Sequence, residues 1–345
     1  MIRPSSPLTM LLSRHTRRRE FITLIGGAAA AWPLAARAQQ GERARRIGML
    51  LGIAENDLEA QSRIAAFRKG LRDLGWVEGR NVHIDYRFAA GDANRIKAYV
   101  AELVTLAPDV FLANSTPVVA ELRQATTSIP IVFAVVNDPV GQGFISSLAH
   151  PGGNITGFTF IEFTMVGKWL EMLKAVSPDM VRAALMFNPN TSPYYDVYLR
   201  SFEAIPRSIA VEVTATPVRN AAEIEEALPK LGRPPGGGLI VPPDVFTIVH
   251  RETIMRSAEE HRLPVIWSYR QFVAEGALIS YGPDTADIFR RSASYVDRIF
   301  KGEKPADLPA QSPINFELAI NLKTATALGL QIPDKLVAIA DEVIE

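Results

Sequence analysis

Short apolar runs alternate with amphipathic stretches along most of the chain. Most of the runs are continuously apolar, which is typical of strands buried on both faces of a sheet. Between them, apolar residues recur every three or four positions, as in a helix packed on one side. The predicted strands are 46–51, 82–88, 110–113, 131–136, 183–187, 211–217, 238–241 and 265–267. The predicted helices are 58–74, 93–106, 117–126, 165–175, 192–205, 221–231, 246–261 and 284–300.

The predicted strands and helices form two consecutive series along the chain. Each series is expected to build one lobe. Strands separated by helices form parallel sheets, because a helix is the usual crossover between parallel strands. We therefore predict an α/β fold with two doubly wound parallel-sheet lobes joined by a multi-strand hinge. Residues 155–159 and 277–282 are predicted to cross between the lobes. Residues 314–345 are predicted to hold a strand followed by two helices.

Because the chain leaves one lobe and later returns, each lobe is expected to combine two separate stretches of sequence. The N-terminal lobe is predicted to comprise 45–155 together with about 284–315. The C-terminal lobe is predicted to comprise 156–283 together with about 316–345. A chain of 345 residues that is 48% hydrophobic is long enough to fill two such cores.

Residues 1–38 have the layout of a cleaved export signal. An arginine-rich start precedes an apolar, alanine-rich stretch, and Ala38 ends a motif of small residues that a signal peptidase recognises. The stretch is too short for a stable membrane span, which needs about 20 apolar residues. Arg18 and Arg19, followed by Phe21, resemble a twin-arginine signal. We predict export to the periplasm with cleavage after about Ala38, by the twin-arginine or the general route; an anchoring helix is the alternative.

Composition excludes several classes of protein. The chain contains no cysteine, which excludes disulfides, a thiol nucleophile and thiolate metal sites. Its 37 Lys and Arg balance 37 Asp and Glu, and loss of the arginine-rich residues 1–38 leaves a small negative charge. Nucleic acid and anionic membrane surfaces are therefore poor partners. We predict a protein that is not embedded in a membrane and that is a monomer.

No catalytic or metal-binding constellation stands out in the sequence. The P-loop, dinucleotide-binding, zinc-protease and nucleophile-elbow motifs are all absent. The histidines after residue 38 lack the spacing of metal ligands; they are His83, His150, His250 and His261. We predict neither an enzyme nor a protein that carries a cofactor or a metal.

Polar residues follow the predicted strands at the edge where doubly wound sheets bind ligands. Ser115 and Thr116 open a helix, where hydroxyls and free N–H groups favour a carboxylate; helix capping is the alternative. Asp244 follows a strand without a basic neighbour in the sequence and favours an ammonium group, with capping as the competing role. The pattern predicts a site with one anion-binding and one cation-binding end.

Further candidates occupy equivalent strand ends or aromatic positions. Asp138 is a possible ligand acceptor or the start of an Asx turn before Pro139, and Asn188 has the same two roles open. Tyr269 and Tyr281 are candidates for stacking on a flat ligand or closing the hinge, although aromatic residues there are more often core. The full predicted ligand-binding set is Gly52, Ser115, Thr116, Asn137, Asp138, Asn188, Asp244, Tyr269 and Tyr281.

Several ordered motifs can be compared with known families. They include Phe67-Arg68-Lys69-Gly70-Leu71, Leu74-Gly75-Trp76-Val77-Glu78-Gly79-Arg80-Asn81-Val82, Ile129-Pro130-Ile131-Val132-Phe133 and Pro151-Gly152-Gly153-Asn154-Ile155-Thr156-Gly157. From about Arg46 to the C-terminus, the chain resembles ABC transporter substrate-binding proteins of the tryptophan/tyrosine-type branch, which are similar to leucine/isoleucine/valine-binding proteins. The resemblance implies a type I periplasmic-binding fold.

The resemblance also implies a function and a set of partners. A periplasmic solute-binding subunit of an ABC importer captures a small molecule, here an amino acid or a related compound, by hinge closure. It then delivers the solute to the permease and its ATPase. A periplasmic sensor that feeds a membrane receptor is the alternative. A transcription regulator on the same fold would need a basic helix-turn-helix before the first lobe, where this sequence has its export signal.

Overall fold

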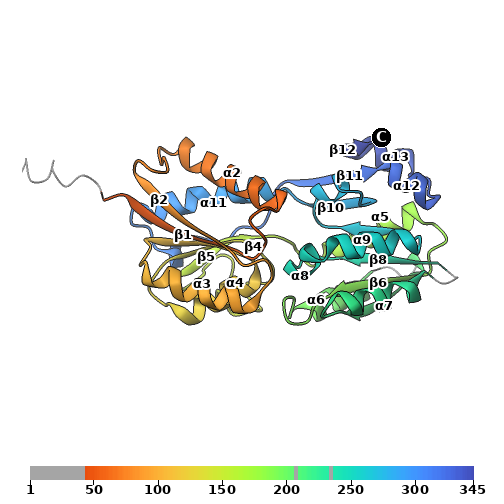
Figure 1. The fold of residues 1–345 in the computed structure, drawn as a ribbon, viewed down its shortest axis with the longest axis horizontal. Helices are drawn as coiled ribbons and strands as arrows, with labels where there is room; N and C mark the ends of the chain where they lie inside the picture. The colour runs from red at the N-terminus through yellow and green to blue at the C-terminus, as the bar shows by residue number, and fades with distance from the viewer. Residues whose placement is uncertain (1–42, 206–208, 233–235) are drawn as a thin grey trace, which may run out of the picture. The chain divides into compact units, whose positions relative to one another are not determined.

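The structure is a computed structural model that describes residues 43–205, 209–232 and 236–345. The predicted export signal lies outside these residues, so export stays a prediction. Arg45–Glu345 form one compact unit built on two sheets with flanking helices (Figure 1). This architecture confirms the predicted α/β class with two parallel-sheet lobes. Within the described ranges, no helix has both the length and the apolar character needed to cross a bilayer.

The N-terminal lobe is built on a parallel sheet with the strand order β2-β1-β3-β4-β5. Helices α2 and α11 pack together on one face, and α3 and α4 cover the other (Figure 1). Successive residues of β1 point to opposite faces of the sheet. Met49 belongs to the same buried apolar cluster as Phe67 of α2, and Leu50 belongs to the same cluster as Val100 of α3. The strands are β1 (Arg45–Leu51), β2 (Val82–Phe88), β3 (Val110–Asn114), β4 (Ile131–Val136) and β5 (Ile155–Thr159). The helices are α2 (Leu58–Asp73), α3 (Ala93–Thr105), α4 (Thr116–Ala125) and α11 (Thr285–Phe300), followed by the short η3 (Pro305–Asp307).

The C-terminal lobe is built on a larger sheet with the order β12-β11-β10-β9-β8-β6-β7. Among the strands that the structure describes in this sheet, only β10 and β11 pair in antiparallel fashion, because β11 enters the sheet from the other lobe. The strands are β6 (Arg182–Phe187), β7 (Glu212–Pro217), β8 (Gly237–Val241), β9 (Val265–Trp267), β10 (Ile279–Pro283), β11 (Phe316–Asn321) and β12 (Glu342–Ile344). The helices are α5 (Met165–Val176), α6 (Tyr195–Glu203), α7 (Ala221–Leu231), α8 (Val245–Val249), α9 (Arg251–Glu260), α10 (Gln271–Ala274), α12 (Leu322–Leu328) and α13 (Asp334–Ile339).

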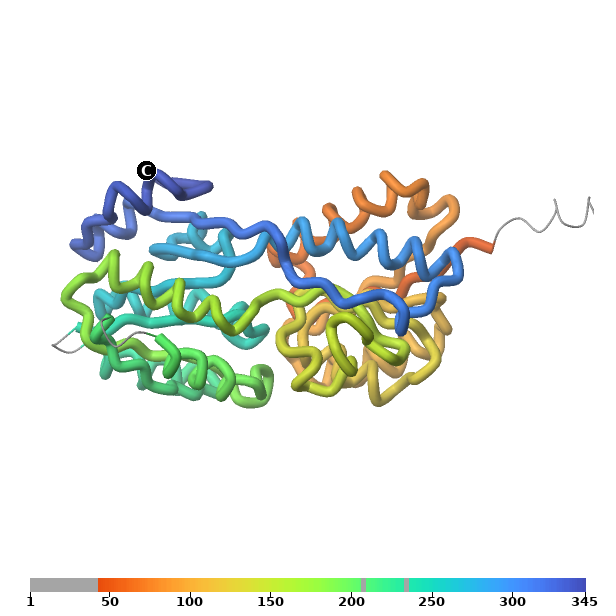
Figure 2. Tube along the Cα trace, turned by 180° about the vertical axis from the view of Figure 1, so that it is seen from behind, coloured from red at the N-terminus to blue at the C-terminus, as the bar shows by residue number. Residues whose placement is uncertain are grey.

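The chain passes between the two sheets after β5, after β10 and again before β11. Because β5 pairs with β4, the first crossing follows Thr159 and not residue 155, where the sequence had suggested the boundary. The segment that leads into the third crossing runs beside the end of β5, where Phe158 is paired with Gln311 (Figure 2). Gln311 N–H donates to the Gly157 carbonyl at 2.9 Å, and the Gln311 carbonyl accepts from Thr159 N–H at 2.9 Å. The segment that leads into β11 is therefore attached to β5 before it passes to the other sheet.

Some local predictions were wrong. Residues 155–159 and 277–282, predicted as crossings, lie mostly within the sheet strands β5 and β10. The single helix predicted over 246–261 is two helices, α8 and α9, because the backbone at His250 (φ −99°, ψ 13°) leaves the helical range. Strand β12 was not predicted. Its extended backbone is stabilised by pairing with the sequence-distant β11, which a local pattern does not reveal.

Candidate functional site

A buried cavity lies where strand ends of the two lobes face each other, and we call it the interlobe cavity. Ligands of doubly wound sheets bind at this edge. The space left open is about 20 Å³, which is room for about one water molecule. The side chains of the two lobes therefore nearly fill the cavity in this closed arrangement. It is lined by Ile53, Arg63, Asn114, Ser115, Thr116, Pro117, Val135, Asn137, Thr191, Tyr194, Pro243, Asp244, Val245, Ile248 and Tyr269.

The backbone is strained at the strand ends of the N-terminal lobe. Ser115, Val135 and Asp138 have φ values of 84°, 60° and 46°, a region that side chains other than glycine rarely adopt. Each such residue costs about 1–3 kcal/mol, and such strain clusters at ligand-binding and catalytic sites. Gly52 makes this arrangement possible, because a Cβ there would lie only 2.6 Å from the Ser115 Oγ. Gly52 thus leaves room for the Ser115 side chain, but it does not line the cavity itself.

Ser115 and Thr116 lie at the start of α4, as predicted, and both line the cavity. The Ser115 side chain does not cap the helix. Its Oγ is buried and has no hydrogen-bond partner within the described residues. A buried hydroxyl without a partner costs about 1–3 kcal/mol, and the first N–H groups of a helix also lack intrahelical partners. These groups are suited to bind an anionic acceptor.

Arg63, which the sequence analysis did not single out, adds a buried cation on the same lobe. Its side chain is 1% exposed, its Nε donates to Glu59 at 2.7 Å, and its Nη1 donates to Asn114 Oδ1 at 3.3 Å. Its Nη2 has no hydrogen-bond partner in the part of the chain that the structure describes. An arginine on the apolar stripe of α2, between Ala60 and Phe67, is the signal that could have identified it.

Asp244 lies on the facing lobe as a buried carboxylate whose hydrogen-bond partners are neutral. Its Oδ1 accepts from Phe246 N–H and its Oδ2 from Asn188 N–H, each at 3.1 Å. Asp244 therefore caps α8, one of the two roles expected from the sequence, and it also lines the cavity. Burial raises the pKa of Asp244 to about 6. A carboxylate at this depth, with no cationic partner among the residues that the structure describes, is suited to an ammonium group.

Asn137 joins the two lobes across the cavity. Its Nδ2 donates to the Tyr194 hydroxyl at 2.9 Å and to the Pro243 carbonyl at 3.3 Å. Its Oδ1 is buried and has no partner among the residues described. Burial and the nearby charge of Asp244 raise the pKa of Tyr194 to about 12, so this hydroxyl stays protonated. Asn137 thus holds the lobes together and leaves one acceptor free for a ligand.

The two predicted aromatic residues have different surroundings. Tyr269 lines the cavity, and its ring stacks on Phe160 with the centroids 5.0 Å apart. The Arg63 guanidinium lies over the same ring, 5.6 Å from its centroid, so Tyr269 connects the lobes in this arrangement. Tyr281 lies on β10 away from the cavity, and its ring stacks on Phe316. The structure thus brings Tyr269 but not Tyr281 to the cavity.

Two further predicted residues do not line the cavity. Asp138 Oδ1 accepts from Gly141 N–H at 3.0 Å, three residues on, so this side chain bonds to the local backbone and does not line the cavity. Asn188 Oδ1 accepts from Asn190 N–H at 2.9 Å, and its own N–H donates to Asp244. The backbone N–H of Asn188 therefore helps to hold the Asp244 carboxylate in place. Within the described ranges, no group of three or more His, Asp or Glu is placed to hold a metal ion.

Comparison with known proteins adds a family to this geometry. The chain is 27% identical over 266 residues to a tyrosine-binding protein of Clostridioides difficile (strain R20291), covering 77% of this chain and 76% of that protein. A solved domain from Streptococcus pneumoniae in complex with L-Trp has a TM-score of 0.80 at 24% identity, covering 87% of this chain and 99% of the other. A ligand-free, open substrate binding protein with adhesive properties from Clostridium difficile has a TM-score of 0.64 at 22% identity, with the same coverage.

The family match is long enough to decide membership. Residues 54–344 match the family described as ABC transporter substrate binding protein. This range includes every residue that lines the interlobe cavity except Ile53. The resemblance seen in the sequence is thereby confirmed, and the chain belongs to the family of ABC transporter substrate-binding proteins.

Proposed function

We propose that this chain is the solute-binding subunit of an ABC importer and that it captures an amino acid between its lobes. The supporting observation is the separation of charge across the interlobe cavity. On one lobe, Arg63 Nη2 and Ser115 Oγ are buried donors without partners among the described residues. On the other lobe, Asp244 is a buried carboxylate whose partners in the described part of the chain are all neutral. An α-amino acid, with its carboxylate next to its ammonium group, would satisfy both ends at once.

The relatives favour an aromatic solute, since one is named for tyrosine and another was solved with L-Trp. The space of about 20 Å³ holds neither, so the solute would enter with the lobes apart. In this proposal each lobe moves as a unit about the crossings between them. One lobe comprises 45–159 with about 284–315, and the other comprises 160–283 with about 316–345. Asn137, Tyr269 and the solute would then hold the closed state that the permease recognises.

The proposal places the protein in the periplasm as a monomer that meets the permease and its ATPase. The signal-like layout of residues 1–38 supports export. Family membership supports the transporter as partner. Neither the charge balance of the sequence nor the family favours nucleic acid.

We expect L-tryptophan and L-tyrosine to raise the Tm of the purified protein. A ligand at 100 times its Kd stabilises the folded state by about 2.7 kcal/mol, which is a shift of several degrees. Tryptamine lacks the carboxylate and indole-3-propionate lacks the ammonium group, so each should give little or no shift. A thermal-shift screen measures all four. The proposal fails if no amino acid raises Tm, and the two-ended site fails if tryptamine binds as tightly as L-tryptophan.

Affinity for the amino acid is expected to fall as the pH drops below about 6. Burial raises the pKa of Asp244 to about 6, and only its ionised form can pair with the ligand's ammonium group. Affinity should be constant above pH 7 and decrease by up to tenfold per pH unit below 6. The stability of the free protein changes with pH in the opposite direction. Because the pKa of Asp244 in the folded protein, about 6, is above its ordinary value of 3.8, stability is lost as the pH rises from 3.8 to about 6. Calorimetric titrations from pH 5 to 8 measure the first effect, and a flat profile would contradict the Asp244 assignment.

A further inference from the structure

An ion pair joins the two lobes where two helices begin. Asp57 is the residue before α2 in the N-terminal lobe, and Arg251 is the first residue of α9 in the C-terminal lobe. Arg251 Nη1 donates to Asp57 Oδ2 at 3.0 Å. Within the described ranges, every other ion pair lies inside one lobe. The Asp57–Arg251 pair therefore exists only while the lobes are closed, because its residues move apart with the helices that they begin.

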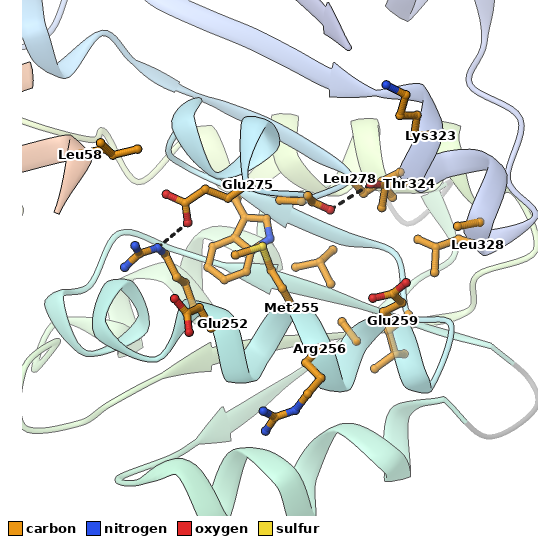
Figure 3. A pocket seen from close by; sticks show the side chains of 18 of the residues that line it. Leu58, Glu252, Met255, Arg256, Glu259, Glu275, Leu278, Lys323, Thr324 and Leu328 are labelled. Carbon is orange, nitrogen blue, oxygen red and sulfur yellow. Dashed lines mark hydrogen bonds and ion pairs between the residues drawn. The ribbon is translucent and has the colours of Figure 1, made fainter. Parts of the chain in front are cut away.

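Arg251 is held in place by its own lobe. Its Nε donates to Glu275 Oε2 at 2.6 Å, a contact drawn in Figure 3, and its Nη1 also donates to the Ile248 carbonyl at 3.0 Å. The guanidinium lies over the Phe272 ring, 5.6 Å from its centroid. None of these three contacts crosses to the other lobe, so the guanidinium should keep its position when the lobes part. A side chain that is already fixed loses little conformational freedom when it pairs.

Asp57 is also fixed by its own lobe, and it is buried. Its Oδ1 accepts from Glu59 N–H at 2.9 Å, which caps α2 and leaves Oδ2 to bind Arg251. Asp57 is 8% exposed, and the Arg251 side chain is 17% exposed. Water and salt screen a pair at this depth much less than an exposed pair. Each charge keeps a hydrogen-bond partner of its own lobe, which offsets part of the free energy of removing it from water.

Neither member of this pair lines the interlobe cavity, whereas Asn137 and Tyr269, which also join the lobes, do line it. We propose that Asp57 and Arg251 form a latch that favours the closed lobes whether or not a solute is bound, and that Glu275 positions Arg251 for it. The inference rests on the proposed function, since it concerns how the lobes retain the solute. A latch outside the cavity acts on the closed state and not on contacts with the solute, so it changes the affinity for every solute by the same factor.

The distance between the lobes tests the latch without any solute. The chain has no cysteine, so two introduced cysteines carry spin labels at chosen positions only. Ala65 of α2 and Glu260 of α9 are exposed and lie on the two helices that begin at the latch. Pulsed electron paramagnetic resonance measures the distance between labels at Ala65→Cys and Glu260→Cys. The protein is unfolded and refolded first, which removes any solute carried through purification.

Asp57→Asn should shift the labelled protein towards the longer distance. Asn caps a helix as well as Asp does, so the bond from Glu59 N–H is retained and only the charge is lost. The ratio of closed to open molecules should fall about tenfold, the scale of one charged hydrogen bond. Asp92→Asn makes the same change at the exposed cap of α3 and should leave the distances unchanged. Unchanged distances in Asp57→Asn, or equal shifts in both variants, overturn the latch.

A double-mutant cycle tests whether the two residues act together. Arg251→Gln should lower the ratio of closed to open molecules by a factor similar to that of Asp57→Asn, and the double variant should lower it no further, because the pair is already broken. A loss of about a hundredfold in the double variant, the product of the single effects, would contradict the latch.

The affinities supply a second readout. Asp57→Asn should weaken L-tryptophan and L-tyrosine by one common factor, up to about tenfold, in calorimetric titrations. Weakening of one amino acid but not the other would place Asp57 in contact with the solute and contradict the latch. The distance measurement needs no solute, so its failure would leave the amino-acid site standing, and the failure of amino acids to bind would leave the distance result standing.

Discussion

Replacing Asp244 by Asn is expected to weaken amino-acid binding about 100-fold or more while the protein stays folded. Removing one partner of a buried charge pair costs about 3–5 kcal/mol, which corresponds to a factor of 100 to 1,000 or more in Kd. Asn keeps the shape of the side chain and one acceptor oxygen, so the bond from Phe246 N–H to residue 244 is retained. Calorimetric titration measures the affinity, and circular dichroism checks the fold. The pH dependence of binding should disappear in the same variant.

The control for Asp244→Asn is Asp92→Asn. Asp92 caps α3 in the same way, by accepting from Asn94 N–H at 2.8 Å, but it lies on the surface away from the interlobe cavity. Its replacement should leave the affinity unchanged within a factor of two. Unchanged affinity in Asp244→Asn would show that the carboxylate serves only α8 and Asn188. Equal losses in both variants would point to a general effect of helix capping.

Replacing Arg63 by Met is expected to cause two separate losses. The first is stability, because Glu59 is 4% exposed and would remain as a buried carboxylate without its ion-pair partner. Breaking one side of such a pair costs about 3–5 kcal/mol. The second is affinity, because a hydrogen bond to a charged group contributes about 1.5–3 kcal/mol, a factor of about 10 to 100. Urea unfolding measures the first loss and calorimetry the second.

A double variant, Glu59→Gln with Arg63→Met, separates these two effects. Replacing both members of a buried pair by neutral groups is often neutral for stability, so the free energy of unfolding should largely recover. The affinity should stay low, because the donor to the ligand's carboxylate is still missing. Lys69→Met is the matched control on α2: its pair with Asp73 is exposed, and its loss should cost under about 1 kcal/mol. Recovery of affinity in the double variant would remove Arg63 from the site.

The sequence pattern identified strand ends that the fold brings together, because the carboxyl ends of parallel strands meet at one edge of a sheet. Ser115, Thr116, Asn137, Asp244 and Tyr269 were expected from their strand ends, and the structure brings them to one cavity. That they touch a ligand is still a proposal. Asp138, Asn188, Gly52 and Tyr281 occupy similar positions in the sequence but do not line the cavity. A strand end places the backbone, whereas local hydrogen bonds decide where each side chain points.

Arg63 shows a different limit of the sequence. It lies in a helix with no turn or strand-end signal, and its nearest charged partner, Glu59, suggests an ordinary surface pair at i and i+4. Only the packing of α2 against α11 buries that pair, and only the closed lobes place Tyr269 over the guanidinium.

By itself, the sequence determined the fold class, the family and most of the elements, because these depend on hydrophobic period and on ordered motifs that are local along the chain. It also determined which residue types were available at each strand end. Only the tertiary structure decided which of them share a cavity, that the lobes are closed around about 20 Å³, and that Asp244 has no cationic partner among the described residues. It also decided that β12 is a strand and that the first crossing follows β5. These features depend on contacts between distant residues, and burial and pairing arise only when those contacts form.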